Sequence, residues 1–453
     1  MPLVPGCMKP GKHAYPEELV SFIFDVWQDP QFVDRLRSAG IDPAFRLPDR
    51  PLLEGIISTC YQASLLQEEQ RPVRFRLIIQ DPRLFPVEDG PPTGLHRFQF
   101  DRPRPFNEYE LSRLSPAADF YRTLIGITLA REDGAQIWGM VHTGTRWLQA
   151  VYGGTKTFPP LPPCPVIYVT GPGQISVGIG AEIIASLAGG QLNCPSLDVF
   201  ASHWLAESFA AVRSEMSELH QQARASAGKP WATLDPDFGR SVGQQVVRRI
   251  ISVIRTAHHG GTLVYLPPEL EHDILAENRY MTVKYQFREE ESRRRFLTLV
   301  LRIMNTFAEL LGDPQDPGKV VGWPDYVACQ DETISLLDEA IFDLAHFIAA
   351  LSATDGAVVM TKRQELIGFG GVISGDIDKV ETVTHALDTE GNLTETELSE
   401  GVGTRHRAAY RLCQELPGAV AIVISQDGNV RVVKWHNDSV TYWDQAPTGV
   451  PGF

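Results

Sequence analysis

The chain has 453 residues, which is enough for two or three domains of ordinary size. It is 43% hydrophobic and 21% charged, as globular proteins are, and no uninterrupted apolar run is long enough to span a membrane, so we expect no membrane anchor and a cytoplasmic location. The net charge of −15 argues against binding to the phosphate backbone of DNA or RNA, so no nucleic-acid partner is expected.

The first half of the chain mixes helical and strand patterns. An amphipathic helix is predicted over 17–27, a second helix over 51–70, and a Pro-rich loop over 80–107. Short runs rich in β-branched residues predict strands at 74–79, 124–129, 136–142 and 166–170. After a Gly-Pro-Gly turn at 171–173, we expect a helix at 181–188 and a helical region at 197–224.

The composition changes between residues 224 and 239, where Ala, Gly, Pro and Asp accumulate. We therefore expect two domains, covering residues 1–235 and 236–453. The expected fold class is mixed α/β, with an α+β domain followed by a mixed sheet flanked by helices.

The second half opens with an amphipathic helix over 242–257, whose apolar stripe we expect to be buried. His258 and His259 follow it, and we interpret them as cations at a helix end, with a metal-binding pair as the alternative. Long helices are predicted at 289–311 and 331–351. The strands that we expect lie at 262–266, 283–287, 358–360, 366–371, 419–425 and 430–435, and a helix is expected at 408–413.

The six cysteines are scattered without the spacing of metal ligands. We therefore interpret them as reduced thiols.

Two short motifs in the second half carry chemical information. Asp355-Gly356-Ala357 places a carboxylate on a turn, and residues 403–409 read Gly-Thr-Arg-His-Arg-Ala-Ala. Arginine forks bind phosphate oxygens bidentately, whereas a carboxylate suits a hard divalent cation or a hydroxyl that must lose its proton. The second motif runs into a helix, whose free N–H groups also favour phosphate. Together the motifs predict a nucleotide site with a metal.

These two motifs resemble those of the diadenylate cyclase family, and the resemblance covers about residues 238–440. It implies an enzyme that joins two ATP molecules into cyclic di-AMP and releases pyrophosphate, with Mg²⁺ or Mn²⁺ as cofactor. Because one site holds one ATP, it also implies a homodimer or a higher oligomer.

The resemblance assigns roles to individual residues. Asp355 would hold the metal, with Gly356 and Ala357 allowing close approach of the backbone. Arg405, His406 and Arg407 would clamp the phosphates, with Thr404 as a neutral donor. The remaining nucleotide-binding residues that it implies are Gly371, Val372, Gly403 and Ser425.

The chain departs from the family pattern in two places. The acidic segment 375–402 is longer than expected, and we interpret it as a solvated loop, with a lid or an oligomer contact as the alternative. Asp427 stands close to the position where the family often carries Glu. A second copy of the tripeptide, Asp133-Gly134-Ala135, is interpreted as a hairpin turn.

The first half of the chain resembles a domain found before such cyclases, called DACNV, which is a presumed sensor. The resembling residues are Leu114–Phe120, Trp138–His142 and Gly171–Val177. The resemblance identifies no ligand for the sensor. Because of the two departures, a nucleotide-binding sensor whose cyclase activity has decayed remains the alternative function.

Overall fold

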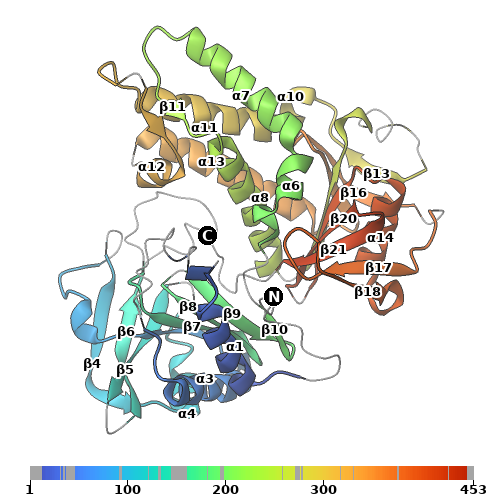
Figure 1. The fold of residues 1–453 in the computed structure, drawn as a ribbon. Coiled ribbons are helices and arrows are strands. Elements are labelled where there is room, and N and C mark those ends of the chain that lie inside the picture. The colour runs from blue at the N-terminus through green and yellow to red at the C-terminus, as the bar shows by residue number, and fades with distance from the viewer. Residues whose placement is uncertain are drawn as a thin grey trace. The chain divides into compact units, whose positions relative to one another are not determined.

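The structure is a computed structural model of the chain, and Figure 1 shows its ribbon. It describes residues 13–30, 32–33, 36, 46–90, 94–120, 122–130, 134–143, 161–180, 182–193, 198–257, 259–270, 276, 279–316, 318–329, 331–374, 377–426 and 428–445. These residues form two compact units, one from His13 to Asn193 and one from Asp198 to Gln445. Among them, no helix combines the length and the apolar character needed to cross a membrane.

The first unit is built on an eight-stranded sheet in the order β10-β9-β8-β7-β3-β5-β6-β4. Only β3 and β5 pair in parallel within it; their neighbours are antiparallel. The strands of this sheet are β3 (Phe75–Ile79), β4 (His96–Pro105), β5 (Thr123–Ala130), β6 (Gly134–His142), β7 (Pro165–Gly171), β8 (Gln174–Ile179), β9 (Glu182–Ala188) and β10 (Gln191–Asn193). A separate small hairpin pairs β1 (Gln67–Glu68) with β2 (Arg71–Pro72).

Helices cover one face of this first sheet. They are α1 (Pro16–Trp27), α3 (Arg50–Ser64) and α4 (Glu108–Leu114). Their apolar residues form one core with alternate strand residues such as Leu77 and Ile125. The residues between these, such as Ile78 and Leu124, belong to a second cluster around Trp138. This alternation follows from the two-residue period of a strand.

The second unit contains a nine-stranded sheet in the order β13-β16-β15-β12-β19-β20-β21-β17-β18. Its pairs are antiparallel except β12–β15 and β17–β21. The strands are β12 (Gly261–Leu266), β13 (Met281–Gln286), β15 (Ala357–Thr361), β16 (Leu366–Ile373), β17 (Thr382–Ala386), β18 (Thr394–Leu398), β19 (Val420–Ile424), β20 (Val430–His436) and β21 (Ser439–Gln445). A separate parallel pair joins β11 (Thr233–Leu234) to β14 (Val320–Val321).

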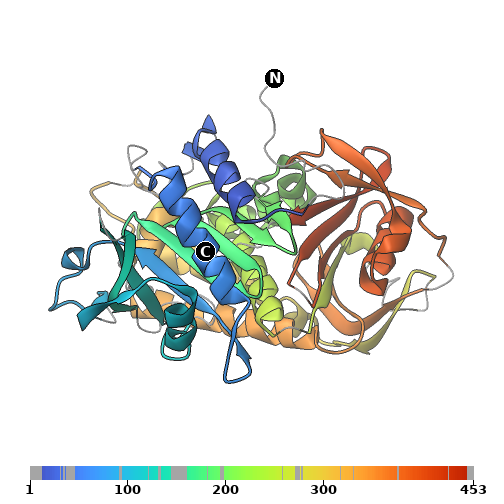
Figure 2. The ribbon, with the colours of Figure 1, turned by 90° about the horizontal axis from the view of Figure 1, so that it is seen from below.

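Helices cover both faces of the nine-stranded sheet. The single helix α14 (Thr404–Glu415) packs on one face through buried residues such as Tyr410 and Leu412. The other face meets a helical layer, and Figure 2 shows α14 apart from it. The helices of the second unit besides α14 are α6 (His203–Ser208), α7 (Ala210–Ala225), α8 (Phe238–Thr256), α10 (Glu290–Arg293), α11 (Arg295–Leu310), α12 (Trp323–Ala328) and α13 (Glu332–Leu351). The mixed α/β fold class is therefore confirmed.

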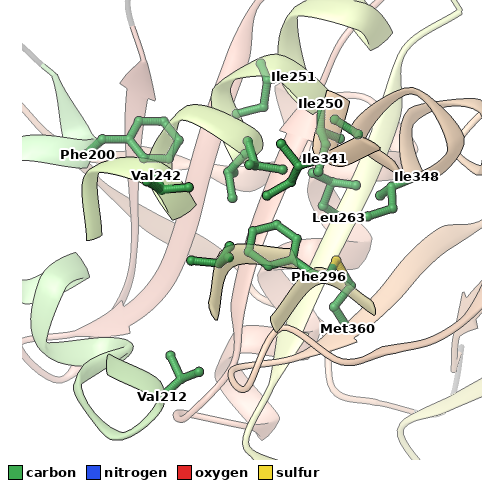
Figure 3. Packing of buried hydrophobic residues seen from close by; sticks show 14 of the residues in the cluster. Phe200, Val212, Val242, Ile250, Ile251, Leu263, Phe296, Ile341, Ile348 and Met360 are labelled. Carbon is green, nitrogen blue, oxygen red and sulfur yellow. The ribbon is translucent and has the colours of Figure 1, made fainter. Parts of the chain in front are cut away.

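The largest core of the chain lies between this helical layer and the sheet. The stripe predicted on α8 is buried, with Ile250 and Ile254 inaccessible to solvent. Figure 3 shows Ile250 and Ile251 close to side chains of the sheet and of α13, such as Leu263 and Ile341. Burying each such side chain contributes about 1.5–3 kcal/mol, so this layer supplies much of the unit's stability.

Several predicted elements are wrong. Segment 181–188 is not a helix, because Glu182–Ala188 is β9, and the loop predicted at 80–107 contains the ten-residue strand β4. The acidic segment 375–402 is not a solvated loop, because β17 and β18 add a hairpin to the sheet beside β21. The helices predicted at 51–70 and 289–311 are shorter than expected, since α3 ends at Ser64 and the second is interrupted at Arg294.

The compact units divide earlier than the predicted domain boundary. Residues 198–225 pack within the second unit, where Phe200, Trp204 and Val212 join the core against α8. The ring of Trp204 also lies 4.3 Å from that of Trp443, between ring centroids, and its indole N–H donates to the carbonyl of Thr389. The change in composition near 224–239 thus falls inside a packed unit.

Two truncations test where the autonomous unit begins. We expect a fragment starting at residue 197 to fold, whereas one starting at residue 236 loses buried core residues that include Phe200, Trp204, Leu205, Val212 and Met216. At about 1.5–3 kcal/mol each, this loss amounts to roughly 8–15 kcal/mol, comparable with the whole stability of a domain. Thermal unfolding followed by circular dichroism checks this. Equal melting temperatures for the two fragments would contradict it.

Candidate functional site

Several strands of the nine-stranded sheet begin or end beside the Asp355 turn. This side of the sheet is formed by strand ends and not by an outermost strand, and we call it the sheet edge of the site. β12 and β15 run parallel with Leu263 opposite Val358, so both strands start at this edge. A Cβ placed on Gly261 would lie 2.8 Å from the hydroxyl oxygen of Ser352, which follows α13 and precedes the turn. Asp355 itself is exposed. The turn therefore presents a carboxylate to solvent beside the start of β12.

Gly356 can only be glycine in this turn. Its φ of +117° lies in a region that other residues avoid, and an added Cβ would lie 2.6 Å from the carbonyl carbon of Gly370. Ala357 follows as the first residue of β15 and pairs with Gly371. Gly371 is equally confined, since its Cβ would meet the Val359 side chain at 2.8 Å. The next residue, Val372, is 45% exposed.

The second motif forms the N-terminus of α14. Gly403 is the N-cap residue, and no side chain caps the first turn. Thr404, Arg405 and Arg407 are exposed there. The uncapped N–H groups of a helix attract an anion, and the two guanidinium groups add formal positive charge. This end of α14 can therefore bind a phosphate group.

Arg405 connects the two motifs in space. A Cβ placed on Gly260 would lie 2.9 Å from Nη1 of Arg405 and 2.8 Å from the carbonyl oxygen of Ile424. Gly260 has a φ of +65° and immediately precedes β12, so the guanidinium group lies at the same sheet edge as the Asp355 turn. The fold brings together an arginine and a carboxylate that are 50 residues apart in the chain.

Ser425 lies at this edge as well, where β19 ends. Its hydroxyl oxygen accepts a hydrogen bond from the backbone N–H of Asn429 at 3.0 Å, and its own N–H donates to the carbonyl of Asn429 at 2.8 Å. These bonds close the turn between β19 and β20. Asp427 lies outside the described residues, and so do Asp133, His258, Gly375 and Asp376.

His406 has different surroundings from its two arginine neighbours. It is half-buried, and burial first, then the positive charge of Arg431, lowers its pKa to about 4. Arg431 in turn forms an ion pair with Asp444 at 2.7 Å and donates to the hydroxyl of Tyr410 at 3.2 Å. The imidazole is therefore neutral at pH 7, and it adds no formal charge to the N-terminal end of α14.

Folding stability should depend on pH through His406. In the unfolded chain His406 is protonated below its pKa of about 6.5, whereas in the folded chain it stays neutral down to about pH 4. The free energy of unfolding should therefore fall by about 1–2 kcal/mol between pH 7 and pH 5, a range reduced for the partial exposure of the ring. Urea unfolding at both pH values should show this loss in the wild type and not in His406→Gln. Replacing the exposed His203 with Gln is the control, and a His406→Gln variant with the wild-type pH dependence would contradict the prediction.

The described residues hold no group of three or more His, Cys, Asp and Glu side chains that could form a metal cage. Asp355 is an exposed carboxylate. Mg²⁺ usually keeps several waters and binds through one or two carboxylates and the phosphates of a substrate, so a single accessible carboxylate fits such an ion. It does not fit a structural metal such as tetrahedral Zn²⁺.

Two features of this region had not been assigned a role from sequence. Gly260 precedes the strand expected at 262–266, and Arg431 lies within the strand expected at 430–435. The signal for Arg431 was a cation in the apolar strand Val430–His436, but its partner Asp444 becomes visible only when β20 and β21 are paired.

Residues 42–142 match the family model described as "Probable sensor domain DACNV", a domain found in diadenylate cyclases, and no family model of the cyclase catalytic domain is detected. The match includes Leu114–Phe120 and Trp138–His142 but not Gly171–Val177. No curated protein and no solved structure matches the chain significantly.

Proposed function

We propose that this chain is a diadenylate cyclase regulated through its N-terminal unit. The observation that carries the proposal is the position of Arg405 against Gly260, at the sheet edge that also presents Asp355. The match of residues 42–142 to a domain found in diadenylate cyclases supports it independently, because that match lies outside the second unit.

In this proposal, one ATP binds with its phosphates at the N-terminus of α14. Arg405 and Arg407 bind phosphate oxygens, and the uncapped N–H groups of the first turn orient them. The adenine lies beside Gly371 and the exposed Val372, while the close packing of Gly356 and Gly371 against neighbouring protein atoms holds this part of the site in place.

The reaction is a nucleotidyl transfer, a substitution at the α-phosphorus of ATP. The 3′-oxygen of one ATP forms a bond to the α-phosphorus of the other, and the bond from that phosphorus to the oxygen bridging to the β-phosphate breaks. Pyrophosphate leaves with the bonding electron pair, and the proton of the 3′-hydroxyl passes to the Asp355 carboxylate or to water. A second, equivalent attack closes the ring.

The residues contribute mainly position and charge. Arg405 and Arg407 offset the negative charge that grows on the departing pyrophosphate, which is the dominant requirement of phosphoryl transfer. Asp355 would hold the divalent cation, Mg²⁺ or Mn²⁺. When bound, that cation lowers the pKa of a coordinated hydroxyl and neutralises phosphate charge. His406, being neutral, can offer phosphate a hydrogen bond but no formal charge.

One sheet edge binds one ATP, so the proposal requires two chains that face each other with two-fold symmetry. At protein concentrations below the dissociation constant of the dimer, pyrophosphate release from ATP and Mn²⁺ should rise with nearly the square of protein concentration. A strictly linear dependence over a thousandfold dilution, with a monomer at the lowest concentrations, would overturn the dimeric site.

A further inference from the structure

The second unit contains an apolar cavity on the sheet face opposite α14. It has a volume of about 90 Å³ and lies between helices α6, α7, α8 and α11 and the strands β12 and β19. Apolar side chains such as Phe209, Val212, Phe296 and Ile422 form its walls. Figure 3 shows Val212 and Phe296 on the inner side of this helical layer. The cavity is thus separated by the sheet from the Arg405 site.

Two polar atoms line this cavity without a hydrogen-bond partner among the described residues. They are the hydroxyl of Tyr265, a residue only 1% exposed, and the side-chain oxygen of Gln364. An unsatisfied buried polar group costs about 1–3 kcal/mol, and native proteins rarely keep one without a reason. The phenol can donate a hydrogen bond and the amide oxygen can accept one, so together they match a ligand hydroxyl.

Helix α8 leaves room for such a ligand. Gly239 and Gly243 are four residues apart, so they lie on one face of the helix, and both line the cavity. Glycine inside a helix costs about 1 kcal/mol relative to alanine. A Cβ on Gly243 would meet no atom within 4 Å, and one on Gly239 would meet only the side chains of Met304 and Met216, at 3.4 Å or more. The two glycines therefore make the helix less stable, and they keep open the space that larger side chains would fill.

Two arginines also line the cavity. Arg240 forms an ion pair with Asp237 at 3.1 Å, and Arg213 donates to the carbonyl of Ala206. Burial, and then the like charge of Arg240, lowers the pKa of Arg213. A carboxylate bound beside both guanidinium groups would relieve this repulsion and form charge-assisted hydrogen bonds.

We propose that this cavity binds a small hydroxylated aromatic carboxylic acid. Its ring lies among the apolar walls, its hydroxyl bonds to Tyr265 and Gln364, and its carboxylate lies beside Arg213 and Arg240. An apolar cavity of about 150 Å³ encloses a benzene ring, whereas this one has about 90 Å³ and is partly open, so the ring lies only partly within it and the carboxylate lies toward solvent. The site is independent of the cyclase proposal, because binding is measured without ATP.

Calorimetry of the full chain with 4-hydroxybenzoate tests this site. We expect a dissociation constant below about 1 mM, with about tenfold weaker binding of benzoate, which lacks the hydroxyl, and of 4-hydroxybenzyl alcohol, which lacks the carboxylate. No measurable binding of 4-hydroxybenzoate, or equal binding of all three compounds, would overturn the proposal.

Two variants locate the binding within the cavity. Gly243→Leu fills it and should abolish binding, whereas Gly55→Leu, at an exposed helical glycine with equally open space, should leave binding unchanged. Tyr265→Phe keeps the ring and removes the hydroxyl, so it should weaken 4-hydroxybenzoate about tenfold while leaving benzoate unchanged. If Gly243→Leu does not fold, the affinity of Tyr265→Phe for 4-hydroxybenzoate tests the site on its own. Undiminished binding of 4-hydroxybenzoate in Tyr265→Phe would exclude this site.

Discussion

Replacing Asp355 with Asn is expected to stop the formation of cyclic di-AMP while the protein still folds and binds ATP. The amide has nearly the shape of the carboxylate, and the side chain is exposed, so the fold should tolerate it. It lacks the charge that holds a divalent cation and the basicity that favours loss of the hydroxyl proton. Losses of this kind reduce rates by about 10²–10⁴-fold. The rate of product formation at saturating ATP measures the effect.

Asp343→Asn is the matched control for this variant. Asp343 is an exposed carboxylate on α13 of the same unit, away from the sheet edge, so the same chemical change should leave the rate within about twofold. Wild-type turnover by Asp355→Asn, under conditions where the control is also active, would remove Asp355 from the mechanism.

The double variant Arg405→Ala/Arg407→Ala is expected to lose affinity for ATP itself. Both side chains are exposed at the uncapped N-terminus of α14, where they can reach phosphate oxygens. Each charge-assisted hydrogen bond contributes about 1.5–3 kcal/mol, so the two together should weaken binding by at least about a hundredfold. Calorimetric titration with a non-hydrolysable ATP analogue measures this without turnover.

Arg411→Ala provides the control on the same helix. Arg411 lies after the first turn of α14, so its removal changes the net charge and leaves the phosphate-binding end intact. The single variant Arg405→Ala should show the larger part of the loss, because Arg405 is the arginine that lies against Gly260. Unchanged ATP affinity in the double variant would refute the phosphate clamp.

Elements with a clear period were predicted well from sequence, and those governed by position in a sheet were not. The stripe of α8 follows the helical period, and its burial is confirmed. The apolar run at 182–188 has no such period, so it was wrongly assigned to a helix, although it pairs with β8. β4 was missed because it contains two prolines, which its place at the edge of the sheet tolerates.

The hairpin of β17 and β18 shows the same difficulty. Its acidic composition suggested a solvated loop, but β18 alternates threonine with glutamate and is exposed along its whole length. An edge strand can carry such charges because one side of it remains in solvent. Composition alone could not distinguish this strand from a loop.

For the candidate site, sequence named the residues but not their relations. The tight fit at Gly356 depends on the backbone of β16, which the local sequence does not place beside it. The position of Arg405 against Gly260 depends on the packing of α14 across the sheet. The neutral state of His406 depends on burial and on Arg431, which follows it by 25 residues. Such effects arise only from tertiary packing.

The most direct test of the proposed cyclase is to identify its product. The purified full chain is incubated with ATP and Mn²⁺, and the nucleotides are separated by chromatography and identified by mass spectrometry. The proposal predicts cyclic di-AMP, with one pyrophosphate released for each ATP consumed, and none from Asp355→Asn. If the wild type binds ATP and returns it unchanged at every protein concentration, the chain is a nucleotide-binding sensor and not a cyclase.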